Sequence, residues 1–504
     1  MSNKRGFYVT TSIPYVNGDP HLGHALEFVQ ADVLARHRRR RGDDVRFLSG
    51  TDDNALKNVD AAVAAGVPVA EFVAQKAERF AALAASLQIS NDDYIRTSID
   101  ARHRPGVERL WRACAAAGDL DQRDYEGLYC AGCEAFVSPE ELEDGLCPEH
   151  REAPEVIRER NWFFRLSRYQ DRLIDLIESG RLRIEPEHRR NEVLSFIRRG
   201  LTDFSVSRAQ ERARGWGIPV PDDPSQVIYV WFDALSNYIT ALDYKSDGDA
   251  YDSWWRASEE RLHVIGKGIV RFHAIYWPAI LLSAGEPLPT TLFVHDYLTA
   301  DGQKLSKSLG NAIDPNELIE RYGADALRWW FLRDVSRNGD ADFREGQLAA
   351  RANELANGLG NLINRTITLV SRHQPHRIQT ATRRPVEAEA LTKRCESLPG
   401  AVDDALAGCD LRVAAAAVWE TVSEANRFVS ATQPWELAKK ARDGDAAASE
   451  HLDDVLGLLV EACWLITREL TPFLPVAAER VASALASLDA GQGRTLFRKF
   501  DEVS

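Results

Sequence analysis

The alternation of strand-like and helix-like segments at the start of the chain constrains its fold most strongly. Residues 7–15 read FYVTTSIPY, an apolar and β-branched run, and residues 21–42 then carry apolar side chains at helical spacing. A second apolar strand over 43–53 and a second helical stretch over 61–87 follow. This order predicts an α/β fold in which a parallel sheet is built with right-handed crossovers. Ligands of such sheets bind beyond the carboxyl ends of the strands.

The regular pattern is interrupted in the middle of the chain and then returns. The apolar runs 227–235 and 262–270 predict further strands of the sheet. Residues 292–311 have the pattern of a strand followed by a polar loop, and residues 325–335 predict a helix. From Gly346 onward, long alanine-rich segments with helical periodicity predict a bundle of helices.

The composition narrows the class of protein. A chain of 504 residues with 44% hydrophobic and 27% charged side chains is typical of a globular protein with several domains. We find neither an apolar run of the roughly 18 residues needed to span a bilayer nor a secretory leader, so we expect a cytoplasmic protein. The net charge of −14 argues against a surface covered with basic patches for non-specific nucleic-acid binding. The basic run at residues 37–41, HRRRR, could contact phosphate, but such a run is more often a solvated helix end, so we assign it no role.

Two histidines lie three residues apart where the first predicted helix begins, in the segment PYVNGDPHLGH. His21 and His24 share one face of a helical turn, and Gly23 allows a ligand to approach the backbone. A helix N-terminus attracts anions, and imidazoles can donate to phosphate oxygens. The segment therefore predicts a nucleotide-binding site, the alternative being a pair of capping or surface histidines.

A cationic segment, KLSKSLG at residues 304–310, lies in the loop after a later strand. Lys304 and Lys307, with the hydroxyls between and beside them, could neutralise the charge that builds on a pyrophosphate leaving group during nucleotidyl transfer. The alternative is an ordinary solvated loop.

Three of the seven cysteines fall between residues 130 and 147. Cys130-x-x-Cys133 and, after thirteen intervening residues, Cys147-x-x-His150 give two pairs of ligands on glycine-bearing turns. This spacing predicts a closed tetrahedral zinc site with a structural role, the alternative being four unliganded side chains. The other four cysteines are expected to be small buried apolar residues: Cys114, Cys395, Cys409 and Cys463.

HLGH and KLSKS resemble the HIGH and KMSKS signatures of class I aminoacyl-tRNA synthetases, in the same order and on either side of an inserted segment. Five longer segments resemble methionyl-tRNA synthetases: SIPYVNGDPHLGH, RNEVLSFIRRGL, VIYVWFDALSNYIT, RFHAIYWPAILL and DGQKLSKSLGNAIDP. The resemblance implies a Rossmann-type parallel sheet split by a zinc-bearing connective insertion, followed by a stem-contact segment and an α-helical anticodon-binding bundle. It implies a first Rossmann half at 1–112, the insertion at 113–225, the second Rossmann half at 226–290, the stem-contact segment with the KLSKS loop at 291–345, and the anticodon-binding domain at 346–504.

The same resemblance implies an enzyme that activates methionine with ATP and Mg²⁺ and transfers it to tRNA(Met), without a covalent enzyme intermediate. The catalytic residues it implies are His21, His24, Lys304 and Lys307, and the ATP-binding residues are His21, Gly23, His24, Lys307 and Ser308. The methionine-binding residues it implies are Ile13, Tyr15, Asp52, Trp231, Leu235, Tyr238, Ile269 and His273. The anticodon-reading residues it implies are Asn357, Asn361 and Trp435. Zn²⁺ is expected to be structural, and the chain is expected to be a monomer without membrane partners.

Three departures from the family pattern lie near the implied active site. The usual GTDEHG is here GTDDNA at residues 50–55, the usual GKDI is GKGI at 266–269, and the loop around Ser207 is longer. Two alternatives therefore stay open. One is a related class I adenylating enzyme with another amino acid or a non-tRNA acyl acceptor, and the other is a catalytically silent RNA-binding protein on the same scaffold. The intact histidines and Lys307 argue against the silent scaffold.

Overall fold

The computed structural model divides the chain into two compact units. The first comprises residues 1–20, 42–82 and 91–295, and the second comprises residues 21–41, 83–90 and 296–504. The residues whose structure is described are 5–130, 132, 135–137, 139–148, 151–300, 302–304, 313–373, 384–488 and 496–500, without the side chains of 135, 136, 140 and 304. Within these ranges, no helix is both long and apolar enough to cross a membrane.

A six-stranded sheet forms the centre of the first unit, with the spatial order β3-β2-β1-β12-β13-β7. Every neighbouring pair of strands runs parallel. The strands are β1 (Gly6–Thr11), β2 (Asp44–Thr51), β3 (Asp93–Arg96), β7 (Arg183–Glu185), β12 (Glu260–Gly266) and β13 (Thr291–His295). The central strands are buried along most of their length, as expected for short apolar runs in a parallel sheet covered on both faces. The predicted α/β fold with a Rossmann-type parallel sheet is confirmed.

Helices follow the first strands of the sheet, as the periodicity predicted. They include α2 (Leu56–Ala65), α3 (Val69–Ser86) and α4 (His103–Ala116). After β12 the chain forms α10 (Trp277–Ala284), which ends at Gly285 in the left-handed conformation, with φ of 73°. A glycine adopts this conformation without steric cost, so it stops the helix before β13 begins.

Two small antiparallel sheets occupy the interruption of the Rossmann pattern. One has the order β5-β4-β6-β8 and the other the order β10-β11-β9. Their strands are β4 (Leu120–Cys130), β5 (Ala135–Val137), β6 (Glu155–Phe164), β8 (Phe204–Ser205), β9 (Ser207–Ala209), β10 (Pro219–Val220) and β11 (Asp223–Ile228). In the sequence, the helices α5 (Gln170–Glu178) and α6 (Glu187–Arg198) lie between β6 and β8. The strand β7 also falls within this part of the sequence but pairs with β13 in the parallel sheet.

The apolar run 227–235 is only partly a strand, so our prediction there was wrong. β11 ends at Ile228, and residues 230–235 form α7 (Val230–Leu235), followed by α8 (Asn237–Thr240). All six residues of α7 are buried. A continuous apolar run carries no periodicity that separates a buried strand from a buried helix, which is why the sequence misled us.

The second unit contains a small sheet of order β15-β14-β16, made of β14 (Leu298–Ala300), β15 (Gln303–Lys304) and β16 (Ala341–Phe343). α11 (Pro315–Tyr322) is capped by Asp314, whose carboxylate accepts from the backbone N–H of Asn316. α12 (Ala324–Asp334) confirms the helix predicted over 325–335.

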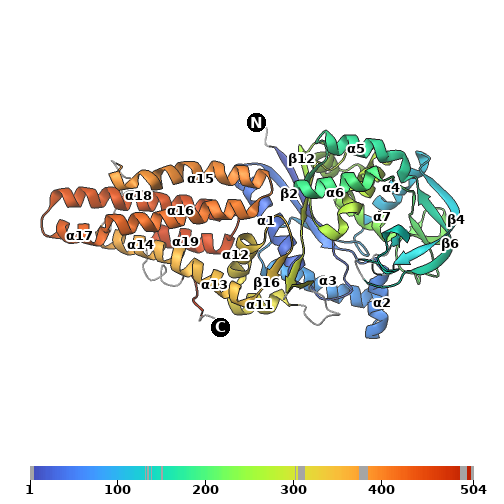
Figure 1. Ribbon diagram of the computed structural model, residues 1–504, viewed down its shortest axis with the longest axis horizontal. Helices are drawn as coiled ribbons and strands as arrows, with labels where there is room; N and C mark the ends of the chain where they lie inside the picture. The colour runs from blue at the N-terminus through green and yellow to red at the C-terminus, as the bar shows by residue number, and fades with distance from the viewer. Residues whose placement is uncertain are drawn as a thin grey trace. The chain divides into compact units, whose positions relative to one another are not determined.

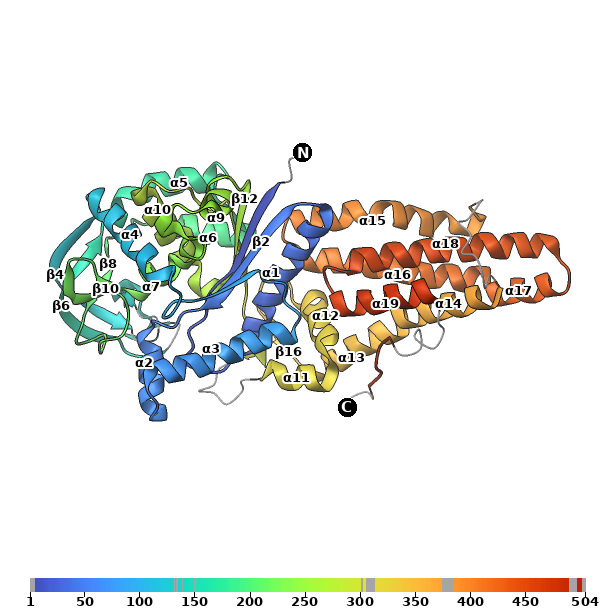
Figure 2. The ribbon, with the colours of Figure 1, turned by 180° about the vertical axis from the view of Figure 1, so that it is seen from behind.

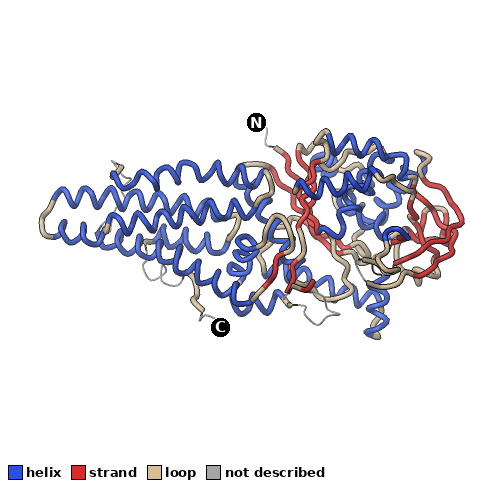
Figure 3. The backbone as a smooth tube through the Cα atoms, viewed as in Figure 1, coloured by secondary structure: helices blue, strands red, loops and turns tan. Residues whose placement is uncertain are grey.

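Helices that lie side by side make up the rest of the second unit, and both Figure 1 and Figure 2 show α15, α16 and α18 adjacent. Figure 3 shows helix over almost all of this part. The helices are α13 (Glu345–Leu355), α14 (Asn361–His373), α15 (Glu389–Ala407), α16 (Leu411–Thr432), α17 (Pro434–Arg442), α18 (Ala446–Leu470) and α19 (Pro475–Ser487). The predicted helical bundle is therefore confirmed.

The basic end of α1 (Leu22–Arg41), to which the sequence analysis assigned no role, forms ion pairs with two acidic side chains of the helical bundle. The Arg41 guanidinium lies 2.6 Å from the carboxylate of Asp403 on α15 and 2.8 Å from that of Glu469 on α18. Arg40 also contacts Glu469, at 3.1 Å, and His37 is 5% exposed. Burial alone would raise the pKa of Glu469, but hydrogen bonds and charge from Arg41 and Arg40 outweigh it and lower that pKa. The arginines thus tie α1 to the helical bundle within the second unit.

The four cysteines outside the proposed zinc segment are mostly buried. Cys114, Cys409 and Cys463 are buried, as predicted, whereas Cys395 is half-buried. Burial raises the pKa of the Cys114 and Cys463 thiols to about 12, so both are neutral at physiological pH and act as small apolar side chains.

Candidate active site

The loops after β1 and β2 meet at the carboxyl edge of the parallel sheet. Tyr15 and Asp52 form a parallel β-bridge, and the backbone N–H of Asp52 donates to the carbonyl of Pro14 at 2.9 Å. Asp52 is 1% exposed, and its Oδ1 accepts from the backbone N–H of Asn54 at 3.1 Å. The buried carboxylate expected to bind the substrate ammonium therefore lies directly beside Tyr15.

Aromatic rings extend from Tyr15 along one wall of the site. The Trp231 ring contacts Tyr15 edge-on, with centroids 6.2 Å apart, and stacks face to face on Phe272 at 3.7 Å. The His273 ring lies edge-on to Trp231, with ring centroids 6.3 Å apart. Sequence analysis missed Phe272, although it directly precedes His273 in the same segment. Three further predicted residues belong to the same apolar core or pack against it: Ile13, Leu235 and Ile269.

A hydrogen bond joins two of the predicted methionine-binding residues. The Tyr238 hydroxyl lies 2.7 Å from Nε2 of His273, and Nδ1 of that histidine lies 3.0 Å from the carbonyl oxygen of Ile269. Because a carbonyl only accepts, Nδ1 carries the proton of the neutral imidazole, and the Tyr238 hydroxyl donates to Nε2. The carbonyl of Ile269 thus fixes both the tautomer of His273 and the direction of the tyrosine hydrogen.

His263 packs against Tyr238 and His273 and was not predicted. Its ring stacks on Tyr238 with centroids 4.1 Å apart, and its Nδ1 lies 2.8 Å from the hydroxyl of Thr10 on β1. Burial, with a further contribution from His273, lowers the pKa of His263 well below 6.5, so it is neutral. It stands within an apolar strand and outside any motif, so its sequence context gave no signal.

The longer loop after Ser207 contacts the segment that follows β2. Trp216 donates from Nε1 to the carbonyl of Asp53 at 2.9 Å, and Arg214 forms an ion pair with Asp60 at 2.8 Å. Two of the three departures from the family pattern are therefore in contact with each other, one residue away from Asp52. The third departure, Gly268, is exposed in the short turn after β12.

The second unit carries the HLGH turn, immediately before and within the first turn of α1. The backbone N–H of Gly23 donates to Nδ1 of His21, and the backbone N–H of His21 donates to Nδ1 of His24, each at 3.1 Å. The two rings stack with centroids 3.7 Å apart. Since both Nδ1 atoms accept, the proton of each neutral imidazole is on Nε2. A Cβ on Gly23 would lie 2.9 Å from Cε1 of His21, so a larger residue there would displace the His21 ring.

The KLSKS and zinc residues are only partly described. Lys304 ends β15, paired with Thr299, and its side chain is not described. Cys130 ends β4 and Cys147 follows a turn, and both are buried. The described part of the chain contains no cluster of three or more metal-binding side chains. The other predicted residues lie outside the described residues: Lys307, Ser308, Cys133 and His150.

The residues expected to read the anticodon lie in the helical bundle. Asn357 is exposed. Its backbone carbonyl accepts from Nδ2 of Asn361 at 2.9 Å, so the two residues lie on successive helical turns. Trp435 is the second residue of α17 and is 46% exposed, an unusual degree for a tryptophan. Because α17 packs against α14, which begins at Asn361, Asn361 and Trp435 lie on neighbouring helices, and Asn357 lies in the helical segment that leads into α14.

The sequence and the fold match known proteins over most of the chain. The family model described as "tRNA synthetases class I (M)" matches residues 7–153 and 130–367. The methionine-tRNA ligase of Brucella suis biovar 1 is 39% identical over 491 residues, covering 96% of this chain and 92% of that protein. The Thermotoga maritima methionine-tRNA ligase is 39% identical over 480 residues, covering 94% of this chain and 74% of that protein.

Solved structures match as well. The crystal structure of Mycobacterium tuberculosis methionyl-tRNA synthetase bound by methionyl-adenylate has a TM-score of 0.89 at 36% identity and covers 95% of this chain and 94% of its own. The free form of that enzyme has a TM-score of 0.83 at 34% identity, covering 95% and 92%. The parallel sheet, the HLGH turn and these matches define a class I tRNA synthetase. Within that class, the chain belongs to the methionine-tRNA ligase family.

Proposed function

We propose that this enzyme activates methionine with ATP to methionyl-adenylate and then transfers the methionyl group to tRNA(Met). The observation that carries the proposal is the bridge between Asp52 and Tyr15, which puts a buried carboxylate at the end of an apolar, aromatic wall. A carboxylate there fits the ammonium of an amino acid, and aromatic and aliphatic side chains fit a thioether.

The pocket residues orient the substrate. Asp52 accepts from the methionine ammonium, while Tyr15, Trp231 and the aliphatic residues enclose the side chain. The Tyr238 hydrogen is directed at His273, so the tyrosine presents oxygen lone pairs rather than its hydrogen to the slot. The methionine carboxylate then attacks the α-phosphorus of ATP in line, and the bond from that phosphorus to pyrophosphate breaks. In the second step the terminal ribose hydroxyl of the tRNA attacks the acyl carbon, and AMP leaves.

His21 and His24 act on the charge that develops at phosphorus. Each carries its proton on Nε2, so each imidazole is a donor suited to a phosphate oxygen. Backbone groups at the start of α1 and the helix dipole add to this preference for anions. Lys304, Lys307 and Ser308 supply further positive charge and hydrogen bonds in this proposal. Magnesium bound with ATP neutralises charge on the phosphates.

A structural zinc ion completes the proposed enzyme. Cys130 and Cys147 are buried thiols whose chemistry suits zinc, and Cys133 and His150 supply the other two ligands. Cys130 ends a strand of the small antiparallel sheet β5-β4-β6-β8, the setting where a metal stabilises a fold that has little core of its own. In the same proposal the insertion spans residues 113–225 and the anticodon-binding domain residues 346–504.

The test is amino-acid-dependent exchange of labelled pyrophosphate into ATP across all twenty amino acids, followed by aminoacylation of tRNA(Met). We expect exchange with methionine alone, and charging of tRNA(Met) in the second assay. Exchange with another amino acid, or activation of methionine without charging, would assign the chain to a divergent adenylating enzyme. Complete inactivity would leave an RNA-binding scaffold.

A further inference from the structure

Asn54 connects the proposed ammonium-binding carboxylate to a second buried carboxylate. Its backbone N–H donates to Oδ1 of Asp52 at 3.1 Å, and its side-chain Nδ2 donates to Oδ2 of Asp233 on α7 at 2.8 Å. The same amide lies 3.4 Å from the carbonyl of Thr97. Both carboxylates are 1% exposed. Asn54 thus links two buried carboxylates, those of Asp52 and Asp233.

A histidine holds Asp233 on its other oxygen. Nε2 of His103 lies 2.5 Å from Oδ1 of Asp233, and Nδ1 lies 2.8 Å from the hydroxyl of Thr240. Because an ionised carboxylate only accepts, Nε2 carries a proton and donates to it. His103 and Thr240 are both fully buried. The pair of hydrogen bonds fixes Asp233 with one oxygen on His103 and the other directed at Asn54.

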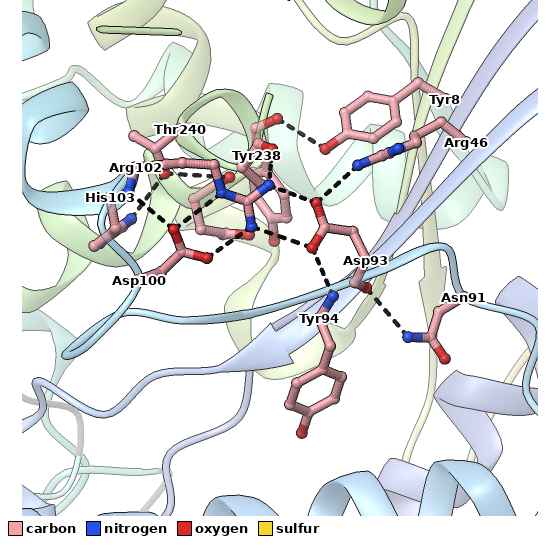
Figure 4. Close-up of polar contacts among 12 residues, drawn as sticks. Tyr8, Arg46, Asn91, Asp93, Tyr94, Asp100, Arg102, His103, Tyr238 and Thr240 are labelled. Atoms are coloured by element: carbon pink, nitrogen blue, oxygen red, sulfur yellow. Dashed lines mark hydrogen bonds and ion pairs between the residues drawn. The ribbon is translucent and has the colours of Figure 1, made fainter. Parts of the chain in front are cut away.

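The start of α4, where His103 lies, is itself held firmly. The guanidinium of the preceding residue, Arg102, lies 2.7 Å from the carboxylate of Asp93 and 2.6 Å from that of Asp100, and it donates to the carbonyl of Ala241. Figure 4 shows this network beside the contact between His103 and Thr240. The contacts that run from α4 through Asp233 to Asn54 therefore start at a residue next to Arg102, whose ion pairs hold the beginning of α4 in place.

The residue type at position 54 matches its two neighbours. A carboxylate at 2.8 Å needs a donor, and the asparagine amide supplies one without adding charge. The family pattern has histidine here, which can donate in the same way from a longer side chain. The substitution in this chain thus retains a donor toward Asp233.

We propose that Asn54 is a positioning residue, which orients Asp52 toward the methionine ammonium by anchoring the loop to the Asp233–His103 pair. This inference rests on the proposed function. Its consequence is specific: loss of the Asn54 amide weakens methionine binding and leaves ATP binding unchanged, because the amide acts through Asp52. Hydrogen bonds that orient metal-binding side chains change metal affinity by about 10- to 100-fold, and we expect an effect of the same order on methionine binding here.

The first variant is Asn54→Asp, which keeps the shape and places two carboxylates against each other. At about pH 8.5 we expect the KM for methionine to rise about tenfold or more in pyrophosphate exchange, with the KM for ATP unchanged. Two carboxylates in contact retain a shared proton, so lowering the pH to about 6 restores a hydrogen bond and returns the KM toward that of the wild type. Asn54→Ala removes the donor without adding charge, so its elevated KM does not recover at low pH.

The second variant is the exchange Asn54→Asp with Asp233→Asn. An asparagine at position 233 can accept from His103 with its oxygen and donate to the new carboxylate with its amide, so both hydrogen bonds are restored with reversed polarity. We expect a methionine KM within about threefold of the wild type and no recovery at low pH. Gln75→Glu is the matched control, since the Gln75 amide also donates to a carboxylate, that of Glu71, but in an exposed pair on α3.

The outcomes separate the inference from the proposed function. If the wild type does not exchange with methionine, the proposed function fails, and the inference fails with it. If the wild type is active but Asn54→Asp and Asn54→Ala keep the wild-type methionine KM, only the positioning role fails. Equal increases in the KM for methionine and ATP, or a single variant that unfolds and is not repaired by the double exchange, would show a merely structural residue.

Discussion

The guanidinium of Arg328 on α12 lies 2.7 Å from the carboxylate of Asp32 on α1, and both side chains are almost completely buried. The same guanidinium donates to the backbone carbonyls of Phe473, Leu87 and Pro472. One side chain therefore satisfies acceptors from three separate segments of the second unit. The arginine fork, with its five fixed donors, is the group suited to that task.

We predict that Arg328→Met lowers the free energy of unfolding by about 3 kcal/mol or more, because the buried carboxylate loses one counterion and three carbonyls lose a donor. Urea denaturation followed by circular dichroism measures the effect. Arg36→Met is the control, since Arg36 also contacts Asp32 at 2.8 Å but its side chain is 23% exposed. An equal loss in the two variants would contradict the special role of the buried arginine.

We predict that His24→Asn slows methionine-dependent pyrophosphate exchange about 100-fold, because asparagine can replace the Nδ1 acceptor but not the Nε2 donor. His24→Gln is the matched variant, because its amide nitrogen reaches the position of Nε2. It should retain at least tenfold more activity than the asparagine variant, on the order expected for one charge-assisted hydrogen bond. The measurement is kcat for exchange at saturating ATP. Equal activity of the two variants would argue that the histidine acts through its backbone contact alone.

We predict that stability falls as the pH is lowered from about 6.5 to about 4, with His37 as one cause. Burial, together with the nearby Arg41, lowers the pKa of His37 from 6.5 to about 4. Between these values the unfolded chain binds a proton that the folded chain excludes, so acid favours unfolding by up to about 3 kcal/mol. Thermal unfolding between about pH 7 and pH 4.5 measures the slope, which His37→Gln should reduce. His451→Gln, at a half-buried position on α18, should leave it unchanged.

Strands could be predicted from the sequence where a short apolar run is bounded by turn residues, as β1, β2, β12 and β13 are. β7 could not, because it has three residues and its partner β13 lies far along the chain. The ion-pair partners of the arginines at the end of α1 could not be predicted for a similar reason. The character of the arginines as a basic run is local, whereas Asp403 and Glu469, which pair with them, lie in helices near the other end of the sequence.

The residues of the candidate site also fall into those that could be predicted from the sequence and those that could not. Asp52, Tyr238 and His273 were assigned through family resemblance, because a buried tyrosine or histidine carries no chemistry that is visible in the sequence alone. His263 and Asp233 were missed, since their roles arise from contacts between elements that only the fold brings together. The HLGH turn was the exception, because two histidines at the start of a helix have a local physical meaning.

We predict that the protein binds one zinc ion per chain and that Cys147→Ser lowers the zinc content to well under half, since it removes one of four ligands. Metal analysis after gel filtration in a buffer without chelator measures this ratio. Cys114→Ser is the control, because Cys114 is buried on α4 and is not one of the four proposed ligands, so it should not change the metal content. A wild-type protein that folds without zinc would refute the prediction.

We predict that Trp435→Ala weakens the binding of tRNA(Met) without affecting adenylation. The exposed indole on α17 offers a stacking surface for an unpaired base. Loss of one stacked base costs about 1–3 kcal/mol, so the KM for tRNA in aminoacylation should rise roughly 10- to 100-fold. Pyrophosphate exchange without tRNA should stay at the wild-type rate. Trp435→Phe retains an aromatic face and should lose less than the alanine variant. If exchange falls together with aminoacylation, Trp435 supports the fold of the bundle rather than contacting the anticodon.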